Sequence, residues 1–453
     1  MKAGGRRPLY GRVPRRLGAA LCAGVVLMPV PARGQIPPPS LPPTLSILAV
    51  PADAPARVIL PAVRALEVKV ATNSLAAQGT GPATVSVTTD LGVAPGRATF
   101  SLAEVPPDIT MEFDLPNGTI RVDGRAVGAF TPVAPLTDNL RFPIDVAVRR
   151  GRKVVSAHRD ITLLLPTVIV PGFSNELRSG PNPLVVQRFA RYGYTAAQPA
   201  TLFWFSFQSH TIGIEEGAQA LAAFVRRAVL PGTYAAKINV VGYSAGAVFA
   251  RWNIQYDVDG WSGLVNRFVM IAAPNEGALL PYIGEHVPSF IPFVQVARSP
   301  LARAICPVFP FWRESAADPW SVPPDGGNAT LAALNARPMP PEVRLYSLYG
   351  NNDPARTGGP QTAARLTGLL PGAAVDYGPG DGIVLTASAL GLPINGSPGV
   401  PAVAERAVRV DVGRVYHTHV LEAAVPQAAA ALQDRFETAA EAAGTAPTVS
   451  PPP

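Results

Sequence analysis

The stretch "KINVVGYSAGAVFAR", Lys237 to Arg251, joins an apolar strand-like run to a helix-like run through a Gly-x-Ser-x-Gly pentapeptide. A nucleophile elbow has this order, because its serine lies on a sharp, strained turn from a strand into a helix. Small residues two positions on either side avoid clashes there, and Gly242 and Gly246 provide them. In a chain with 41 glycines the pentapeptide alone is weak support, so the interpretation of Ser244 as a nucleophile depends on the remaining sequence.

Length and composition indicate a globular protein of two or three domains with well-buried cores, since 48% of the 453 residues are apolar and only 15% are charged. The formal charge of +7 belongs to the amino-terminal leader. Residues 1–34 contain seven of the 38 basic residues and no acidic residue, which leaves 31 basic and 31 acidic residues in the remainder. The charge therefore gives no reason to expect a nucleic-acid partner.

The leader has the pattern of a secretory signal peptide: a cationic start, an apolar run from Leu17 to Val30, and small residues before position 35. The alternative, a membrane anchor, is disfavoured because the apolar run is short for a bilayer span. We therefore expect residues 1–34 to be removed and the protein to be secreted or periplasmic. Cys306 is then the only cysteine of the mature chain, which excludes an intramolecular disulfide and disfavours a cysteine-ligated metal site.

Residues 35–44 form a proline-rich linker, and the segment 45–165 that follows alternates apolar and polar residues between turn signals. Runs such as "ATVSVTT", "ITMEFDL" and "FPIDVAVRR" are typical of short strands. We predict an all-β domain of immunoglobulin-like sandwich type. The segment shows no chemistry, and its single histidine, His158, is expected to be structural.

From residue 166 to residue 442 the pattern changes to apolar strands separated by helices, which predicts a mostly parallel sheet with helices on both faces. Within this segment, residues 279–341 are rich in Phe, Pro and Trp. They fit either a cap over an apolar acyl pocket or simple packing on the sheet. A proline-rich tail, residues 443–453, is expected to be disordered. The predicted strands are 167–170, 202–207, 238–241, 267–271, 343–349 and 407–412.

A serine nucleophile requires a general base and an acid that orients the base. Two histidines, His417 and His419, follow the last predicted strand. We prefer His417 because its following residues, "THVL", place apolar positions where the closing helix should pack, and His419 remains the alternative. His210, after an earlier strand, is expected to be a loop or rim residue.

The acid should lie between the serine and the histidine in chain order. Asp353 directly follows a strand, which favours it on topology, whereas Asp381 lies between glycines in a turn that can expose a carboxylate to an imidazole. The residues alone leave both open. An oxyanion hole also needs backbone donors, for which we expect the amides of Ala245 and Phe173.

Residues 166–435 resemble the α/β-hydrolase lipases and esterases, near the bacterial lipase and lecithin:cholesterol acyltransferase-like groups. The resemblance rests on an ordered set of segments, "VIVPGF", "VVGYSAGAVFAR", "VNRFVMIAAPNEGA", "GDGIVLTASALG" and "YHTHVL". It implies that Asp381, the Asp before Gly-x-Val, is the triad acid, and it agrees with His417 as the base. The sequence departs from the family at Pro171, where many lipases have His.

Together these features predict a secreted, lipase-like serine hydrolase that cleaves carboxylic esters through Ser244, His417 and Asp381 and an acyl-enzyme intermediate. An acyltransferase or amidase with the same triad is one alternative. Another is a surface- or polymer-binding protein with a β-sandwich recognition module and an inactive hydrolase domain. An ester or lipid substrate is expected, with transient contact at a lipid surface, and no metal or other cofactor, since no metal-ligand cluster or phosphate loop is apparent.

Overall fold

The computed structural model describes thirteen ranges of the chain, all within one compact unit, Ser40–Pro453. These are residues 44–47, 57–71, 81–91, 96–106, 108–172, 181–197, 200–206, 213–277, 329–351, 380–381, 384–394, 398–415 and 417–435. Several sequence predictions lie outside the described residues: the leader 1–34, the tail 443–453, residues 279–328 of the suggested cap, Phe173, His210, Cys306 and Asp353. In the ranges above, no helix is both long and apolar enough to cross a membrane.

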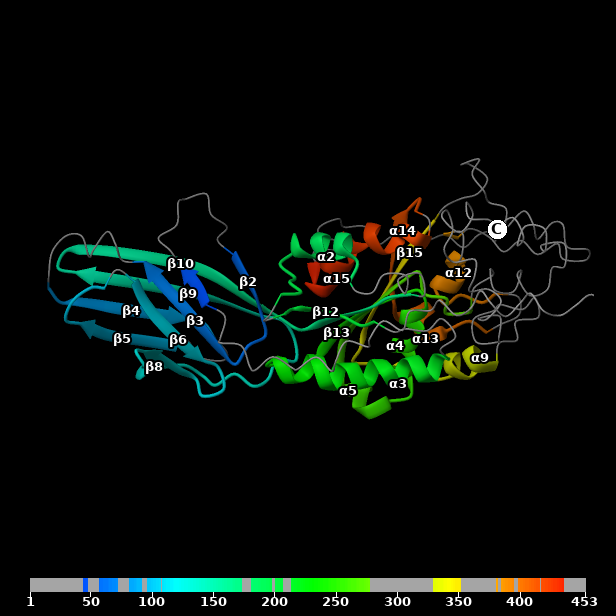
Figure 1. Cartoon of the computed structure of the whole chain (residues 1–453), viewed down its shortest axis with the longest axis horizontal. Helices are drawn as coiled ribbons and strands as arrows, with labels where there is room; N and C mark the ends of the chain where they lie inside the picture. The colour runs from blue at the N-terminus through cyan, green and yellow to red at the C-terminus, as the bar shows by residue number, and fades with distance from the viewer. Residues whose placement is uncertain are drawn as a thin grey trace, which may run out of the picture. The chain divides into compact units, whose positions relative to one another are not determined.

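The front part of the chain is a ten-stranded, mostly antiparallel sheet in the order β1-β3-β6-β7-β8-β5-β4-β9-β10-β2, drawn in blue to teal in Figure 1. Two pairs of strands are parallel, β1 with β3 and β2 with β10. The strands are β1 (Thr44–Ile47), β2 (Arg57–Pro61), β3 (Ala65–Ala71), β4 (Ala83–Thr89), β5 (Gly96–Leu102), β6 (Asp108–Asp114), β7 (Thr119–Val122), β8 (Arg125–Ala129), β9 (Leu140–Arg150) and β10 (Lys153–Leu164).

The predicted all-β domain is confirmed, but its strands form one continuous curled sheet in place of the two separate sheets of an immunoglobulin-like sandwich. The sheet has two halves, β1-β3-β6-β7-β8 and β5-β4-β9-β10-β2. They are joined by a short pairing of β5 with β8, at Arg97↔Ala129 and Ala98↔Gly128. A Cβ atom at Gly128 would lie 2.4 Å from the Cβ of Ala98. Glycine therefore permits the close strand contact that joins the halves around one apolar core.

The second part of the chain, the α/β part, contains a six-stranded sheet in the order β12-β11-β13-β14-β15-β16, with every neighbouring pair parallel. All residues of β13 and β14 are buried, as expected for central strands covered on both faces. The predicted α/β class with a parallel sheet is confirmed, and the arrangement is α/β-hydrolase-like. The strands are β11 (Thr167–Val170), β12 (Leu202–Trp204), β13 (Ile238–Tyr243), β14 (Val265–Ile271), β15 (Arg344–Gly350) and β16 (Val408–Gly413).

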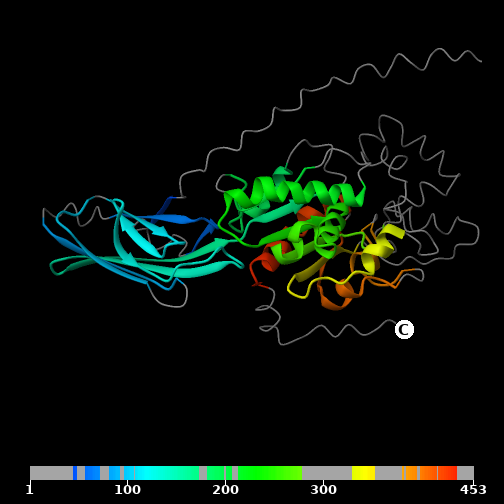
Figure 2. The same cartoon turned by 90° about the horizontal axis from the view of Figure 1, so that it is seen from below.

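Helices cover the two faces of this sheet, and successive strand residues contribute to opposite cores. Val240 belongs to the core on the side of α3, α4, α5, α9 and α13, whereas Val241 belongs to the core under α2, α14 and α15. Figure 1 shows the two groups of helices above and below the strands, and Figure 2, seen from below, shows α3 and α4 in front of the strands. The helices are α2 (Pro183–Ala190), α3 (Ile214–Phe224), α4 (Ala245–Gln255), α5 (Trp261–Leu264), α9 (Ala329–Asn335), α12 (Thr386–Ala389), α13 (Pro401–Arg406), α14 (His417–Ala423) and α15 (Val425–Leu432).

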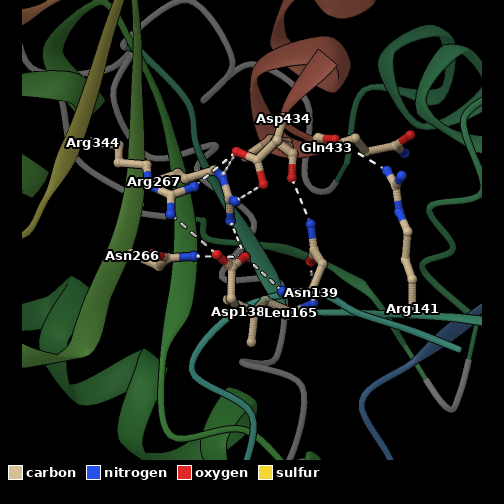
Figure 3. A network of polar contacts seen from close by, with 10 residues as sticks. Asp138, Asn139, Arg141, Leu165, Asn266, Arg267, Arg344, Gln433 and Asp434 are labelled. Carbon is tan, nitrogen blue, oxygen red and sulfur yellow. Dashed lines mark hydrogen bonds and ion pairs between the residues drawn. The ribbon is translucent and has the colours of Figure 1, made fainter. Parts of the chain in front are cut away.

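A polar network connects the front sheet to the parallel sheet (Figure 3). Arg267 of β14 is fully buried, and its Nη1 lies 2.8 Å from Oδ1 of Asp138, in the connection between β8 and β9. Its Nε donates to Oδ1 of Asp434, just after α15, at 3.0 Å. Arg344, the first residue of β15, bridges the same two carboxylates at 3.3 and 2.9 Å. Asp138 thus connects the front part of the chain to β14 and β15, and Asp434 binds the same two arginines from the end of α15.

Tyr234, which precedes β13, connects the two parts through apolar and backbone contacts. Its ring belongs to the apolar core of the front sheet, and its hydroxyl donates to the carbonyl of Val133 at 2.7 Å. Its backbone N–H donates to Ala62 at 2.9 Å, and its carbonyl accepts from Leu136 at 3.1 Å. The front sheet is therefore packed against the α/β part through a shared core.

Candidate active site

Ser244 lies at the turn between β13 and α4, with φ 53° and ψ −129°. A positive φ is strained for a residue with a Cβ atom, and such strain is concentrated at functional sites. The backbone N–H of Ser244 donates to Ile271 of β14 at 2.9 Å, and its carbonyl accepts from Ala247 at 3.0 Å. These two bonds hold the strained residue at the carboxyl end of the sheet.

Three glycines make room for this turn. A Cβ atom at Gly242 would lie 2.5 Å from the Cα of Ala247, and one at Gly246 would lie 2.2 Å from the carbonyl oxygen of Val170. A Cβ atom at Gly172, after β11, would lie 2.6 Å from the Cβ of Ser244. The first two are the glycines of the pentapeptide, and the third brings the loop after β11 against the serine.

His417, at the start of α14, brings Ser244 and Asp381 together. Its Nε2 lies 2.9 Å from Oγ of Ser244, and its Nδ1 lies 2.7 Å from Oδ2 of Asp381. The side chains are buried, with His417 5% exposed and Asp381 2% exposed. The backbone N–H of His417 also donates to the carbonyl of Asp381 at 2.9 Å. Both ring nitrogens of His417 therefore have partners, and its backbone is hydrogen-bonded to that of Asp381.

Local backbone geometry orients the carboxylate of Asp381. Its Oδ1 accepts from the backbone N–H of Val384 at 2.9 Å, and its own N–H donates to the carbonyl of Val384 at 3.1 Å. Gly350, at the end of β15, permits a close approach, because a Cβ atom there would lie 3.1 Å from the Cβ of Asp381. One carboxylate oxygen thus binds the turn while the other faces the imidazole.

Tyr243, the residue before Ser244, contacts His417 and is a member of the site that sequence reasoning missed. Its hydroxyl donates to the carbonyl oxygen of His417 at 2.5 Å, and its ring lies 5.2 Å from the imidazole at 31°. The only sequence signal was an aromatic residue at the variable second position of the pentapeptide. Its contact with His417 joins residues that are 174 positions apart, which no local pattern indicates.

The other predicted residues are placed as follows. His419 is exposed on α14, two residues beyond His417. Ala245 opens α4, so its N–H is among those without an intrahelical acceptor. His158 is on the exposed face of β10, where its Nδ1 lies 2.7 Å from Oδ1 of Asp145. Asp353 and Phe173 lie outside the described ranges.

The electrostatic setting is that of a buried imidazole beside a buried carboxylate. In the part of the chain that the structure describes, no group of three or more His, Cys, Asp or Glu side chains could hold a metal ion. A neutral imidazole that accepts at Nε2 and donates from Nδ1 to a carboxylate can remove a proton from a serine hydroxyl. The arrangement can therefore perform nucleophilic chemistry at Oγ of Ser244.

No protein-family model and no curated protein sequence matches this chain. Among solved structures it is similar to the Bacillus licheniformis lipase BlEst2 in mature form, with 15% identity over 59% of this chain and 92% of that chain and a TM-score of 0.38. It is also similar to phospholipase PlaB from Legionella pneumophila, with 16% identity over 50% and 45% of the two chains and a TM-score of 0.32. The metagenomic carboxyl esterase MGS0156 is 17% identical over 60% and 76%, with a TM-score of 0.33. All three are distant structural similarities.

Proposed function

We propose that this chain is a serine hydrolase that cleaves carboxylic esters, with Ser244 as the nucleophile, His417 as the base and Asp381 as the acid. One observation carries the proposal: an unbroken hydrogen-bonded path of 2.7 and 2.9 Å from Asp381 through His417 to Ser244, whose backbone is strained. The order Ser, Asp, His along the chain is that of α/β-hydrolases.

In the first half of the proposed reaction, Oγ of Ser244 attacks the ester carbonyl carbon while Nε2 of His417 takes the hydroxyl proton. Asp381 stabilises the imidazolium through Nδ1. The tetrahedral intermediate then collapses, the carbon–oxygen bond to the alcohol breaks, and His417 returns the proton to the leaving alcohol. The product of this half is an acyl group on Ser244 and a free alcohol.

In the second half, a water molecule takes the place of the alcohol. His417 removes a proton from the water as its oxygen attacks the acyl carbon, and the same proton returns to Oγ of Ser244 when the acid product leaves. A competing alcohol in place of water would give acyl transfer. Product analysis with and without added alcohol therefore tests the acyltransferase alternative.

The negative charge of the intermediate requires backbone donors at the carbonyl oxygen. Ala245 is the first residue of α4, and the positive end of that helix supports an anion at the same place. The loop after β11 approaches Ser244 through Gly172, which supports the expectation that the adjacent Phe173 amide is the second donor.

A fluorophosphonate probe and p-nitrophenyl esters of graded chain length test the proposal. The wild-type protein should be labelled and should hydrolyse at least one ester, whereas Ser244→Ala should do neither. Ser262→Ala, a partly exposed serine on α5, is the matched control and should behave as wild type. Undiminished labelling of Ser244→Ala would overturn the assignment, and the ester panel would define the acyl length that the site prefers.

The proposal includes export, because the leader has the pattern of a signal peptide. Protein recovered outside the cytoplasm should then begin near Gln35 by amino-terminal sequencing. A chain that retains residues 1–34 in the cytoplasmic fraction would contradict this part of the proposal.

A further inference from the structure

A buried polar cluster, the Arg251 network, consists of Arg251, Gln255, Asn275, Glu276 and Asn335. Arg251 is on α4, the helix that begins after Ser244, and is 0% exposed. Its guanidinium donates to Asn275 at 2.8 Å, to Asn335 at 2.7 Å and to Gln255 at 3.1 Å. Burial lowers the pKa of Arg251 to about 10, against the opposing effect of Glu276, so the side chain stays charged at neutral pH.

Asn275 connects α4 to α12. Its Oδ1 accepts from Arg251, and its Nδ2 donates to the carbonyl of Ala389, the last residue of α12, at 2.9 Å. The next residue, Glu276, donates its backbone N–H to Oγ of Ser388 at 3.0 Å. The carbonyl of Ala389 also accepts from Oγ of Ser347 on β15 at 2.7 Å. The carboxyl end of α12 is therefore fixed to the nucleophile helix and to the sheet.

The segment before α12 carries the proposed acid. Val384, which binds the carboxylate of Asp381, is two residues before the start of α12. These contacts form a closed path. From Ser244 the path follows α4 to Arg251 and passes through Asn275 to α12. From α12 it returns to Asp381, which contacts Ser244 through His417. The Arg251 network therefore connects α4 to the segment that carries Asp381 by a route separate from His417.

We infer that Arg251 and Asn275 are positioning residues that set the placement of Asp381 relative to Ser244, an inference that rests on the proposed function. The guanidinium is planar and holds its acceptors in fixed directions, and full burial means that water does not replace a lost partner. Removal of the Asn275 link would let α12 and the carboxylate shift away from the imidazole. Misplacement of a reacting group by about 1 Å is sufficient to cost about 10²-fold in rate.

The chain offers a matched control, because Asn253 is also on α4 and also 0% exposed, but its Nδ2 donates to the carbonyl of Ala218 on α3, at 2.7 Å. Asn275→Ala should lower kcat by about 10²-fold with little change in KM. Asn253→Ala should lose comparable thermal stability but retain kcat. Equal losses of kcat in the two variants, or retained kcat in Asn275→Ala, would overturn the inference.

A spectroscopic measurement separates this inference from the proposed function. The Nδ1 proton of His417, shared with Asp381, should give a downfield proton resonance in the wild type that weakens or moves in Asn275→Ala and not in Asn253→Ala. An unchanged resonance in Asn275→Ala would contradict positioning even if its rate fell. If the wild-type protein hydrolysed no ester and were not labelled by fluorophosphonate, the proposed function would be wrong. The His417 resonance in the two variants would still show whether Asn275 positions Asp381.

Arg251→Lys is the second variant, in case Asn275→Ala does not fold. Lysine keeps the positive charge beside Glu276 but lacks the fork that binds three acceptors. Its kcat should lie between those of the wild type and Asn275→Ala, with the His417 resonance shifted in the same direction. Wild-type kcat and an unchanged resonance in Arg251→Lys would count against the role of the guanidinium.

Discussion

The hydroxyl of Tyr243 donates a 2.5 Å hydrogen bond to the main-chain carbonyl of His417, and the two rings lie 5.2 Å apart. Tyr243 immediately precedes the proposed nucleophile, so one side chain links the elbow to the backbone of the proposed base. Tyr243 is only 2% exposed, so water does not readily replace the hydrogen bond of its hydroxyl. The elbow and the start of α14 are therefore coupled by a contact separate from the imidazole itself.

Tyr243→Phe removes this hydrogen bond and keeps the ring. We expect the free energy of unfolding to fall by about 1–3 kcal/mol, because the carbonyl of His417 is left buried without this donor. We expect kcat to fall by up to about tenfold, equivalent to about 1.4 kcal/mol of transition-state stabilisation. Denaturant unfolding and steady-state kinetics measure the two effects. Wild-type kcat in a destabilised variant would show that the contact supports the fold alone.

Gly172→Ala tests the close approach of Gly172, after β11, to Ser244. The added methyl would lie 2.6 Å from the Cβ and 3.1 Å from the Oγ of Ser244, so the loop or the serine must move. We expect labelling by fluorophosphonate to be abolished or strongly slowed, with stability reduced by about 1–3 kcal/mol.

Gly263→Ala is the control for this substitution, since a Cβ atom there would meet nothing within 4 Å. Gly263 is in α5, where alanine is favoured over glycine by about 0.5–1 kcal/mol. The variant should be as active as the wild type and equally or more stable. Rapid labelling of Gly172→Ala would show that the loop after β11 is not fixed against the serine.

Asp138→Asn tests the charge network between the front sheet and the α/β part. Burial alone would raise the pKa of Asp138, but the hydrogen bond and charge of Arg267, the backbone hydrogen bond of Asn139 and the charge of Arg344 together outweigh it and hold the pKa below its ordinary value of 3.8. A carboxylate with a lowered pKa stabilises the fold above that ordinary value and loses its contribution as the pH falls through the folded-state pKa. Asp138→Asn should therefore be less stable than the wild type at neutral pH, and the difference should fade below about pH 4.

The size of this effect is limited by solvent. The side chain of Asp138 is 39% exposed, so we expect a loss of roughly 1–2 kcal/mol, less than the loss of roughly 3–5 kcal/mol for fully buried pairs. Chemical denaturation at a series of pH values measures it. Asp108→Asn, at the exposed start of β6, is the matched control and should change stability little. A difference between wild type and Asp138→Asn that persisted or grew in acid would contradict the assignment.

The strands were the most predictable part of the fold. The runs 167–170 and 238–241 match β11 and the first four residues of β13, because central parallel strands are continuous apolar stretches bounded by turns. The strand predicted at 202–207 is shorter, since β12 ends at Trp204. An edge strand has a neighbour on one side only, so its length depends less on its own sequence than on that neighbour.

Contacts between residues far apart in the chain could not be predicted from the sequence. The joining of the front strands into one sheet depends on the two-residue pairing of β5 with β8, which alternation does not reveal. Arg251 follows the apolar run Ala245–Ala250 of α4, and its acceptors Asn275 and Asn335 are 24 and 84 residues away. The choice between Asp353 and Asp381 was open on residues alone, and the family resemblance favoured Asp381, which the structure places against His417.

Asp381→Asn tests the acid most directly, because it changes the charge and little else. The amide can keep its oxygen on the N–H of Val384, which now binds Oδ1 at 2.9 Å, so the turn should survive. Its nitrogen would then face Nδ1 of His417 and donate to it, which places the ring proton on Nε2. An imidazole protonated at Nε2 has no lone pair for the hydroxyl of Ser244. We expect kcat to fall by about 10⁴-fold with stability nearly unchanged. Asp353→Asn and His419→Gln should keep most of the activity. Full activity in Asp381→Asn, with loss in Asp353→Asn, would reassign the acid.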